Sequence, residues 1–240
     1  MLGKLLSALV AVGLSYIAEK HNLLPPSQFG GRPGRCTTDA MHQVVQKIKD
    51  ARQAKKVASI LFLNIQAAFP NTVKECLLHN MRSRQVPTPY ICLIDCMLSD
   101  RQTWLHFNNF TSEPILLSNG TTQGCPLSML LYAFYNAELT KITHGKNELA
   151  AGFVDDCVFV ATTVNLNDSH RILKDMMEHQ NSVLNWSLNH NSKFKISKLA
   201  VMDFPAHTKQ SPQHPLSLNK DLKTAPQQLI PLLMCRTTDT

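Results

Sequence analysis

Apolar positions along the chain alternate between helical and strand spacing, and this pattern predicts a domain that contains both kinds of element. Two apolar stretches, at residues 57–63 and 150–161, predict buried strands, and a pair of acids divides the second into strand, tight turn and strand. Stretches with apolar residues three and four apart, or apolar on every side, predict helices. The expected helices are 5–20, 37–54, 71–84, 88–100, 126–141 and 167–189.

The remaining segments have weaker patterns. Residues 104–117 alternate loosely and predict a hairpin, and residues 194–204 predict one more strand. Proline and glycine at residues 25–34 predict a loop, after which Thr37 or Thr38 can cap a helix with Ala40, Val44, Val45 and Ile48 on one face. From residue 206 the chain lacks periodicity, so we expect a loosely ordered tail over 206–240.

The first apolar run has three interpretations. Residues 5–18 carry no charge, which also suits a secretory signal, although the run is too short for a comfortable membrane span. The segment continues directly into EKHNLLPP, as the end of a buried helix would. We expect a core helix that packs through Leu5, Leu9 and Val12 or their neighbours; a signal peptide and a membrane anchor are the alternatives.

Composition narrows the class of protein. The 240 residues are 44% apolar, enough for one sizeable core, which excludes a wholly disordered chain. Of the net charge of +7, most lies in residues 1–60, which carry nine basic and three acidic side chains. Such a segment suits a polyanionic partner, although a solvated basic face has the same composition.

The seven cysteines argue for an intracellular protein. They are odd in number, scattered and without a CxxC pair, so a structural metal site is not expected. We expect reduced and mostly buried thiols, in the nucleus or cytoplasm, without stable membrane association.

The strongest chemical signal is the pair Asp155 and Asp156 between two apolar runs. Adjacent acids are common turn residues, and this remains the simpler interpretation of the pair alone. Asn64 ends another predicted strand, and the loop at residues 120–128 combines glycine with Gln123. Acidic side chains at neighbouring strand ends can hold Mg²⁺, which prefers oxygen ligands and bridges substrate phosphates.

The order of four segments resembles a known family. FLNIQAAFPN, NGTTQGCPLSMLLYAFYNAEL, AGFVDD and WSLNHNSKFKISKLAVMDF follow one another as in the reverse transcriptase domain of non-LTR (LINE-type) retrotransposons, with most similarity to fungal copies. The opening SYIAEKHNLLPPSQFGGRPGRCTTDAMH is similar to the segment before the palm in that family. The resemblance covers roughly residues 3–205.

This resemblance implies an α+β fold, a right-hand polymerase palm made of an antiparallel sheet with packed helices. It implies partial fingers at 1–56, the palm at 57–205 and the tail at 206–240. The implied partners are an RNA template, a DNA primer and a dNTP, whose reaction two Mg²⁺ ions assist. Nucleic-acid binding is expected to be weak, unspecific in sequence and dependent on salt.

The resemblance also assigns residues to roles. Asp155 and Asp156 match the metal-binding acids of the third palm motif, and Phe69 matches the aromatic gate against a ribose 2′-hydroxyl. Gln123 and Gly124 match the turn that lies against the dNTP and template. Lys198 matches a lysine that can protonate pyrophosphate, with a plain surface lysine as the alternative.

Arg32 and Arg35 resemble a basic loop near the template strand.

Two departures from the family pattern point to a catalytically impaired relic. Asn64 stands where the family has the first palm aspartate, which removes one carboxylate from the site. The chain is also expected to begin inside the fingers and to lack thumb, RNase H and endonuclease modules. An active polymerase domain, and a non-enzymatic secreted or membrane-associated protein, are the competing hypotheses.

Overall fold

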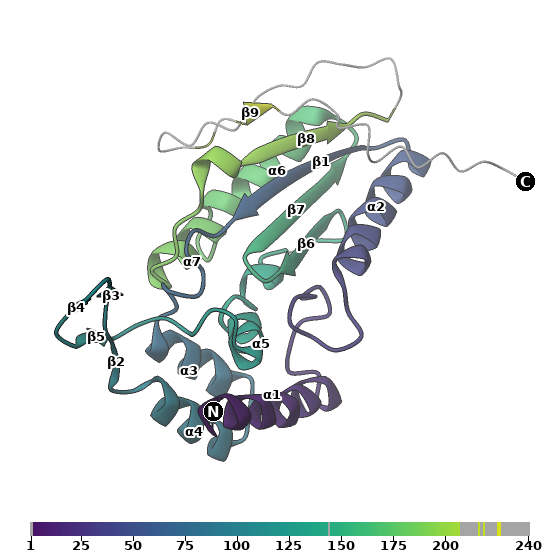
Figure 1. Cartoon of the computed structure of the whole chain (residues 1–240). Coiled ribbons are helices and arrows are strands. Elements are labelled where there is room, and N and C mark those ends of the chain that lie inside the picture. Colours follow the sequence, from purple (N-terminus) through teal and green to yellow (C-terminus); the bar gives the residue numbers. More distant parts are fainter. Residues whose placement is uncertain (1, 144, 207–215, 217, 219–224, 227–240) are drawn as a thin grey trace, which may run out of the picture.

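The computed structural model describes residues 2–143, 145–206, 216, 218 and 225–226, and it has a five-stranded sheet at its centre (Figure 1). The strand order is β6-β7-β1-β8-β9, and all neighbours are antiparallel except β8 and β9. The expected mixed α+β fold with an antiparallel sheet is confirmed. The strands are β1 Val57–Asn64, β6 Glu148–Phe153, β7 Asp156–Thr163, β8 Ala200–Phe204 and β9 Ala225–Pro226.

Alternation along the strands divides the core into two clusters, because neighbouring residues of a strand face opposite sides of the sheet. Ile60 and Val160 pack with Val44 of helix α2 on one face. Leu61 and Phe159 belong to the larger cluster on the other face, where α6 lies. The helices are α1 Leu2–Lys20, α2 Thr37–Gln53, α3 Lys74–Ser83, α4 Thr88–Leu98, α5 Pro126–Tyr135, α6 Leu166–Glu178 and α7 Val183–Asn189.

A second group of helices, α1, α3, α4 and α5, lies beyond one end of the sheet (Figure 1). Helix α5 is buried along almost its whole surface, as its all-apolar sequence predicted. Helix α1 packs on α5, and by length and composition alone it could also cross a membrane. Because one side of α1 belongs to the core of the domain, the expectation of a core helix is confirmed.

The face by which α1 packs differs from the prediction. Leu5, Leu9 and Val12 are 63%, 64% and 71% exposed, whereas Leu14 and Ala18 are fully buried, with Val10 beside them. The named contact residues were therefore wrong. The run is apolar on several sides, so its periodicity could not identify the buried face.

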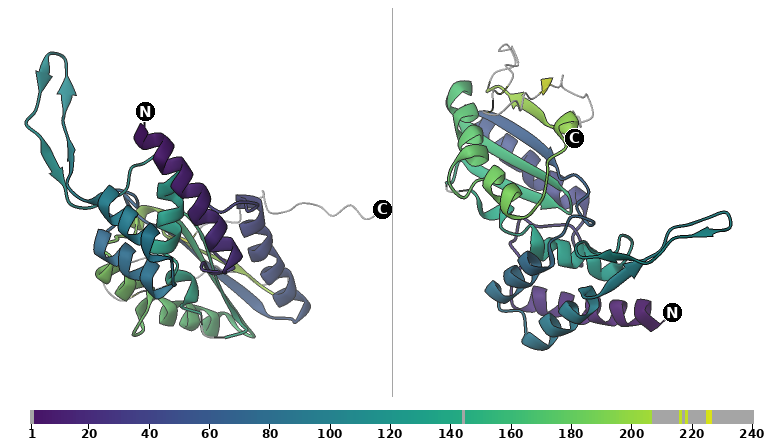
Figure 2. Two further views of the ribbon diagram at one scale, coloured as in Figure 1. Left: turned by 90° about the horizontal axis from the view of Figure 1, so that it is seen from below. Right: turned by 90° about the vertical axis from the view of Figure 1, so that its left-hand side faces the viewer.

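The expected hairpin is present as a long arm that projects from the helical group (Figure 2). Near its base β2 (Arg101–Thr103) pairs with β5 (Ile115–Leu117), and near its tip β3 (His106–Phe107) pairs with β4 (Phe110–Thr111). The loose alternation in this segment arises because its side chains are almost all exposed.

Several element boundaries differ from the expected ones. The helix expected over 167–189 is two helices, because residues 179–182 form a turn in which Asn181 has φ 66°. Its N-cap is Asn165, whose side chain accepts from the Asp168 backbone N–H, and α2 is capped by Cys36 rather than by a threonine. The expected strand over 194–204 is shorter, because residues 196–198 form a 3-10 turn before β8.

The remaining expectations concern the tail and the cysteines. Most of the tail at 206–240 lies outside the described residues, although Leu216 and Leu218 are buried in the larger cluster. Of the six cysteines in the described part of the chain, all are free thiols and only Cys157 is buried. The expectation of mostly buried thiols was therefore wrong.

Candidate active site

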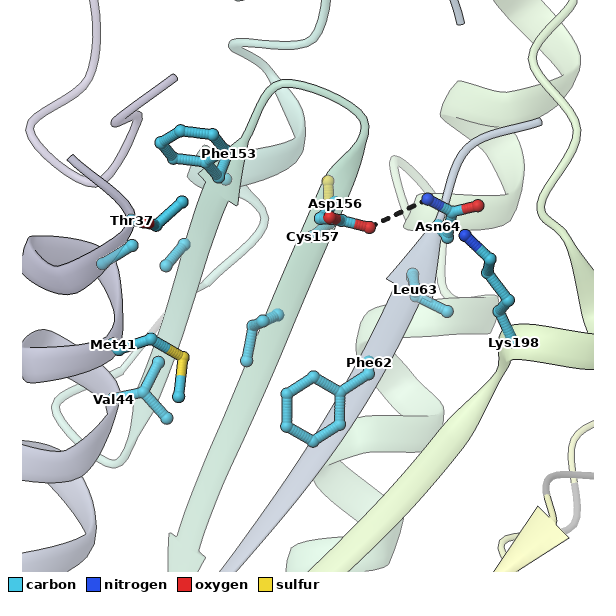
Figure 3. A pocket seen from close by; sticks show the side chains of 14 residues that line it. Thr37, Met41, Val44, Phe62, Leu63, Asn64, Phe153, Asp156, Cys157 and Lys198 are labelled. Carbon is cyan, nitrogen blue, oxygen red and sulfur yellow. Dashed lines mark hydrogen bonds between the residues drawn. The ribbon is translucent and has the colours of Figure 1, made fainter. Parts of the chain in front are cut away.

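The C-terminal end of β1 brings Asn64 against the acid pair, although 91 residues separate Asn64 from Asp155 in the sequence. Asn64 is the register partner of Asp156 at the first position of β7. Its Nδ2 atom donates to Asp156 Oδ1 over 2.8 Å (Figure 3). The same atom donates to Asp155 Oδ2 over 3.3 Å. Asn64 and Asp155 therefore lie side by side, as a metal site made from neighbouring strand ends requires.

The two acids project from a tight turn between β6 and β7. Val154 opens this turn with φ 57°, a left-handed conformation that a β-branched residue rarely adopts. The backbone N–H of Ile65, just after β1, donates to the Asp155 carbonyl over 2.9 Å. The turn is therefore fixed to the end of β1 by its backbone as well as by the side chain of Asn64.

Burial differs sharply within a few residues of the turn. Asp155 is half-buried and Asp156 is exposed, so both carboxylates can reach solvent or a bound cation. Cys157 follows directly and is buried, and burial raises the pKa of its thiol to about 12. Burial also raises the pKa of the Tyr132 hydroxyl well above its ordinary value. Both groups are neutral at physiological pH.

A cavity of about 330 Å³ lies between α2 and the sheet, and its lining reaches this strand end (Figure 3). Asn64, Asp156 and Lys198 supply its polar part, and Lys198 extends beside Asn64 from the segment before β8. The other walls are largely apolar. They are formed by Thr37, Ala40, Met41, Val44, Phe62, Leu63, Ala151, Gly152, Phe153, Cys157 and Val158.

Phe69 and the glycine loop form a second part of the site. The Thr121 backbone N–H donates to the Phe69 carbonyl over 2.8 Å, which fixes the loop at residues 120–125 to the segment that follows β1. The Phe69 ring is half-buried and lies 5.5 Å from the Tyr132 ring. Gln123 and Gly124, further along the loop, are exposed, and Gly124 has φ 84°.

The two arginines expected near the template are held by the protein itself. The Arg32 guanidinium is 2% exposed and forms two bonds with Glu19, of 2.6 and 2.8 Å. It also donates to the carbonyls of Pro25 and Gln28. Arg32 therefore fixes the loop internally and is not available to a template strand, contrary to the expectation. Arg35 is half-buried, donates to the Pro26 carbonyl and lies over the Phe29 ring.

One carboxylate oxygen from each acid approaches the same point beside Asn64. Asp155 and Asp156 both direct an oxygen at the same amide nitrogen, so a cation at that point can have two carboxylate ligands. Asn64 brings no charge, and its amide hydrogens now face both acids. No group of three or more His, Cys, Asp or Glu side chains that could hold a metal ion occurs in the described part of the chain.

The sequence analysis missed Asn136, which follows α5. Its Nδ2 donates to the Val154 carbonyl over 2.6 Å, and its Oδ1 accepts from Gln28 Nε2 over 3.1 Å. Both side chains are buried. The only available signal was a carboxamide inside the apolar segment YAFYNAEL, because a buried polar side chain requires a specific partner.

Comparison with known sequences gives consistent matches. The family described as "Reverse transcriptase (RNA-dependent DNA polymerase)" matches residues 1–219. The chain is 32% identical over 160 residues to the probable RNA-directed DNA polymerase from transposon X-element of Drosophila melanogaster, covering 65% of this chain and 18% of that protein. It is 26% identical over 219 residues to the RNA-directed DNA polymerase from mobile element jockey of the same species, covering 88% and 23%. The chain thus spans about a fifth of these relatives.

Solved structures show a similar fold. Apo telomerase from Candida tropicalis, truncated from its C-terminal domain, superposes with a TM-score of 0.58 at 10% identity, over 88% of this chain and 41% of that one. Telomerase of the same organism in complex with a TWJ fragment of telomeric RNA gives 0.57 at 9% identity, over 85% and 34%. At these identities the likeness concerns the fold alone.

Proposed function

The chain belongs to the reverse transcriptase family, and on this premise we propose that it is the polymerase palm, with part of the fingers, of a non-LTR retrotransposon, with an impaired catalytic centre. Residues 1–56 correspond to fingers and 57–205 to the palm. The same proposal includes a location in the nucleus or cytoplasm and a sequence relationship to the fungal copies of this element. The alternative of a secreted or membrane-associated protein is not favoured. It rested on the apolar run at residues 5–18, which lies in helix α1, and this helix packs on α5.

The proposed reaction is RNA-templated DNA synthesis. The 3′-hydroxyl of a DNA primer attacks the α-phosphorus of an incoming dNTP, a new P–O bond forms, and pyrophosphate leaves. The contact of Asn64 with Asp155 and Asp156 carries this proposal, because two neighbouring strands present polar side chains to a single point beside a cavity. Phe69 would limit the space at the sugar, and Gln123 and Gly124 would line the base.

Asp155 and Asp156 would hold Mg²⁺ at the turn. When bound, Mg²⁺ would supply positive charge to the phosphates and lower the pKa of the primer hydroxyl. Lys198 lies on the same side as Asn64 and could give a proton to the departing pyrophosphate. Arg32 has no role toward the template in this proposal because Glu19 holds it within the fold.

Asn64 accounts for the proposed impairment. At ~4 Å and an effective dielectric constant of ~20, one unit-charge interaction contributes about 4 kcal/mol. At about 1.4 kcal/mol per decade, its loss corresponds to roughly a thousandfold in rate as an upper bound. The amide also donates to both acids, so a cation must displace these two hydrogen bonds before it can bind.

A primer-extension assay on an RNA template tests the proposal. We expect no extension by the natural chain with Mg²⁺ and at most a trace with Mn²⁺. Asn64→Asp is expected to extend slightly more, and Asn64→Asp combined with Asp155→Asn and Asp156→Asn is expected to lose that gain. Robust Mg²⁺-dependent synthesis by the natural chain would contradict the impairment. Failure of the natural chain to retard an RNA–DNA primer-template at low salt would contradict the proposed substrate class.

A further inference from the structure

The loop at residues 25–34 lies along the edge of the sheet next to the acid turn. Gln28 forms a parallel bridge with Gly152 of the edge strand β6. The Phe29 backbone N–H donates to the Gly152 carbonyl over 2.8 Å, and the Gly152 N–H donates to the Ser27 carbonyl over 3.0 Å. Gly152 lies two residues before Val154, so this contact reaches the base of the turn.

The approach of the loop leaves no room for side chains at two glycines. A Cβ atom on Gly152 would lie 2.2 Å from Gln28 Oε1, and one on Gly30 would lie 2.5 Å from the Val154 backbone nitrogen. At Gly30 the neighbouring atom belongs to the backbone, so this position needs glycine, whereas a side chain at Gly152 would require the end of the Gln28 side chain to shift. The loop therefore contacts both the edge strand and the turn itself.

A buried chain of two carboxamides provides a second connection. Gln28 Nε2 donates to Asn136 Oδ1 over 3.1 Å, and Asn136 Nδ2 donates to the Val154 carbonyl over 2.6 Å. Gln28 is fully buried and Asn136 is 1% exposed, so water does not compete for these bonds. The bond to Val154 is made at the residue with the unfavourable positive φ.

A strained backbone conformation persists only where the surrounding structure holds it. Backbone contacts hold this turn through the loop at Gly152 and through the Ile65 N–H at the Asp155 carbonyl. Side-chain contacts come from the Asn64 amide at the two acids and from the Asn136 amide at the Val154 carbonyl. The Asn136 side chain, unlike that of Asn64, does not touch the acids themselves, so its contact can be removed without altering the backbone hydrogen bonds or the acid site.

We propose that Asn136, supported by Gln28, is a positioning residue that fixes the left-handed turn from which Asp155 and Asp156 meet at one point. The inference rests on the proposed function, since positioning matters only if the acids bind a cation. Asn136 does not touch the cation; it acts through the Val154 carbonyl. Without it, the turn can relax toward ordinary φ values and the two carboxylates no longer converge.

Asn80 is a matched control. It is also a buried asparagine, 6% exposed, and its Nδ2 donates to a backbone carbonyl over 3.0 Å. That carbonyl belongs to Tyr135, the residue before Asn136, so the Asn80 amide itself bonds helix α5 and not the acid turn. Asn80→Ala and Asn136→Ala should therefore lower thermal stability by similar amounts.

The main measurement is the affinity of the full chain carrying Asn64→Asp for Mn²⁺. The EPR signal of the unbound ion reports how much Mn²⁺ remains free. Adding Asn136→Ala should weaken Mn²⁺ binding about tenfold or more, the usual effect of removing a group that orients metal ligands. Adding Asn80→Ala should change it by less than about twofold. Gln28→Met should give an intermediate loss, because the Asn136–Val154 bond remains. Equal Mn²⁺ affinities with Asn136→Ala and Asn80→Ala would overturn the proposal.

A second measurement separates this inference from the proposed function. In the natural chain without metal, Asn136→Ala should accelerate hydrogen exchange of the Ile65 amide, which donates to Asp155, at least tenfold more than Asn80→Ala does. If Asn64→Asp binds no Mn²⁺ at the acids, the proposed function fails while this exchange result still decides the positioning role. If Asn136→Ala does not fold, Gln28→Met provides both measurements. Unchanged exchange at Ile65 would refute the proposal.

Discussion

The side-chain nitrogen of Asn64 donates to Asp156 Oδ1 over 2.8 Å, at the point where β1 ends and the antiparallel strand β7 begins. The same nitrogen also donates to Asp155 Oδ2. Two neighbouring carboxylates repel each other unless a donor or a cation lies between them. Asn64 provides that donor within the chain.

Asn64→Asp should make the stability of the fold depend on divalent cations. The substitution removes two hydrogen bonds and adds a third carboxylate, which we expect to cost about 1–2 kcal/mol in a chelating buffer, near the lower part of the range for bonds to charged groups because Asp156 is exposed. Mg²⁺ or Mn²⁺ should restore the loss. Thermal unfolding with EDTA and with millimolar-range Mg²⁺ measures both effects.

Asn71→Asp is the control for that experiment. Asn71 lies seven residues after Asn64, is half-buried, and its amide donates to the Gln66 carbonyl rather than to an acid. Its replacement adds the same charge outside the site. An equal response of both variants to Mg²⁺ would mean that cations stabilise the chain by general screening.

The strands were predictable because their apolar, branched residues have few alternatives to burial in a sheet. The buried face of α1 was not, since Leu5 and Leu9 share the four-residue spacing of Val10 and Leu14. Packing against α5 decides between the two sets, and no local pattern records that contact. The break between α6 and α7 was missed because helical periodicity continues through it, although Asn181 tolerates the left-handed conformation it adopts there.

Two loop glycines should differ in their sensitivity to alanine. Both have positive φ, 91° at Gly120 and 84° at Gly124, so each substitution carries a conformational cost of about 1–2 kcal/mol. A Cβ on Gly120 would also lie 2.6 Å from the Pro70 carbonyl oxygen, whereas nothing lies within 4 Å at Gly124. We expect Gly120→Ala to cost at least about 1 kcal/mol more in urea unfolding. Equal losses would show that the loop moves away from Pro70 easily.

Removal of Glu19 should destabilise the chain far more than loss of a surface pair. Glu19→Gln leaves the Arg32 guanidinium buried without its anion, and the expected cost is about 3 kcal/mol. The Arg32 hydrogen bond holds the pKa of Glu19 below its ordinary 4.5, so the contribution of Glu19 is present above pH 4.5 and is lost as the pH falls through the folded-state pKa.

Urea unfolding over the pH range 3 to 6, roughly, checks this prediction. Arg171→Gln is the control, because Arg171 is 72% exposed in its pair with Asp168 and should contribute less than about 1 kcal/mol. A Glu19→Gln chain that loses stability with acid as steeply as the natural chain would contradict the role of the pair.

The residues of the candidate site were predictable where a short stretch of sequence identifies them. They were not predictable where their role depends on a contact with a residue far away in the sequence. The acid pair stands out between two apolar runs, and Asn64 ends a third. Arg32 was expected near the template strand from the family resemblance, yet Glu19 of helix α1 holds its guanidinium within the fold. Asn136 carried only the signal of a carboxamide within an apolar segment, and this did not reveal its partner, the Val154 carbonyl 18 residues later.

RNA–DNA duplex binding should depend on the basic residues of α2. Lys49 and Arg52 are exposed, and replacing both with glutamine should weaken binding about tenfold near 50 mM salt and reduce the slope of log K against log salt by up to about 2. Replacing the exposed Lys146 and Arg171 removes the same charge elsewhere. Gel retardation across a salt series compares the two pairs, and identical slopes would assign the attraction to net charge alone.

Acidification should destabilise the fold through His190. Its ring stacks on Trp186 with centroids 4.7 Å apart, and burial lowers the pKa of His190 below its ordinary 6.5. Above pH 6.5 the imidazole is neutral in both states, so its contribution to stability is complete. As the pH falls below 6.5 the unfolded chain binds the proton first, and the free energy of unfolding decreases until the folded-state pKa is passed.

His190→Phe keeps the stacking and removes the titration. Urea unfolding at pH values from about 5 to 8 should therefore give a shallower curve for His190→Phe, and two parallel curves would exclude His190 as the source.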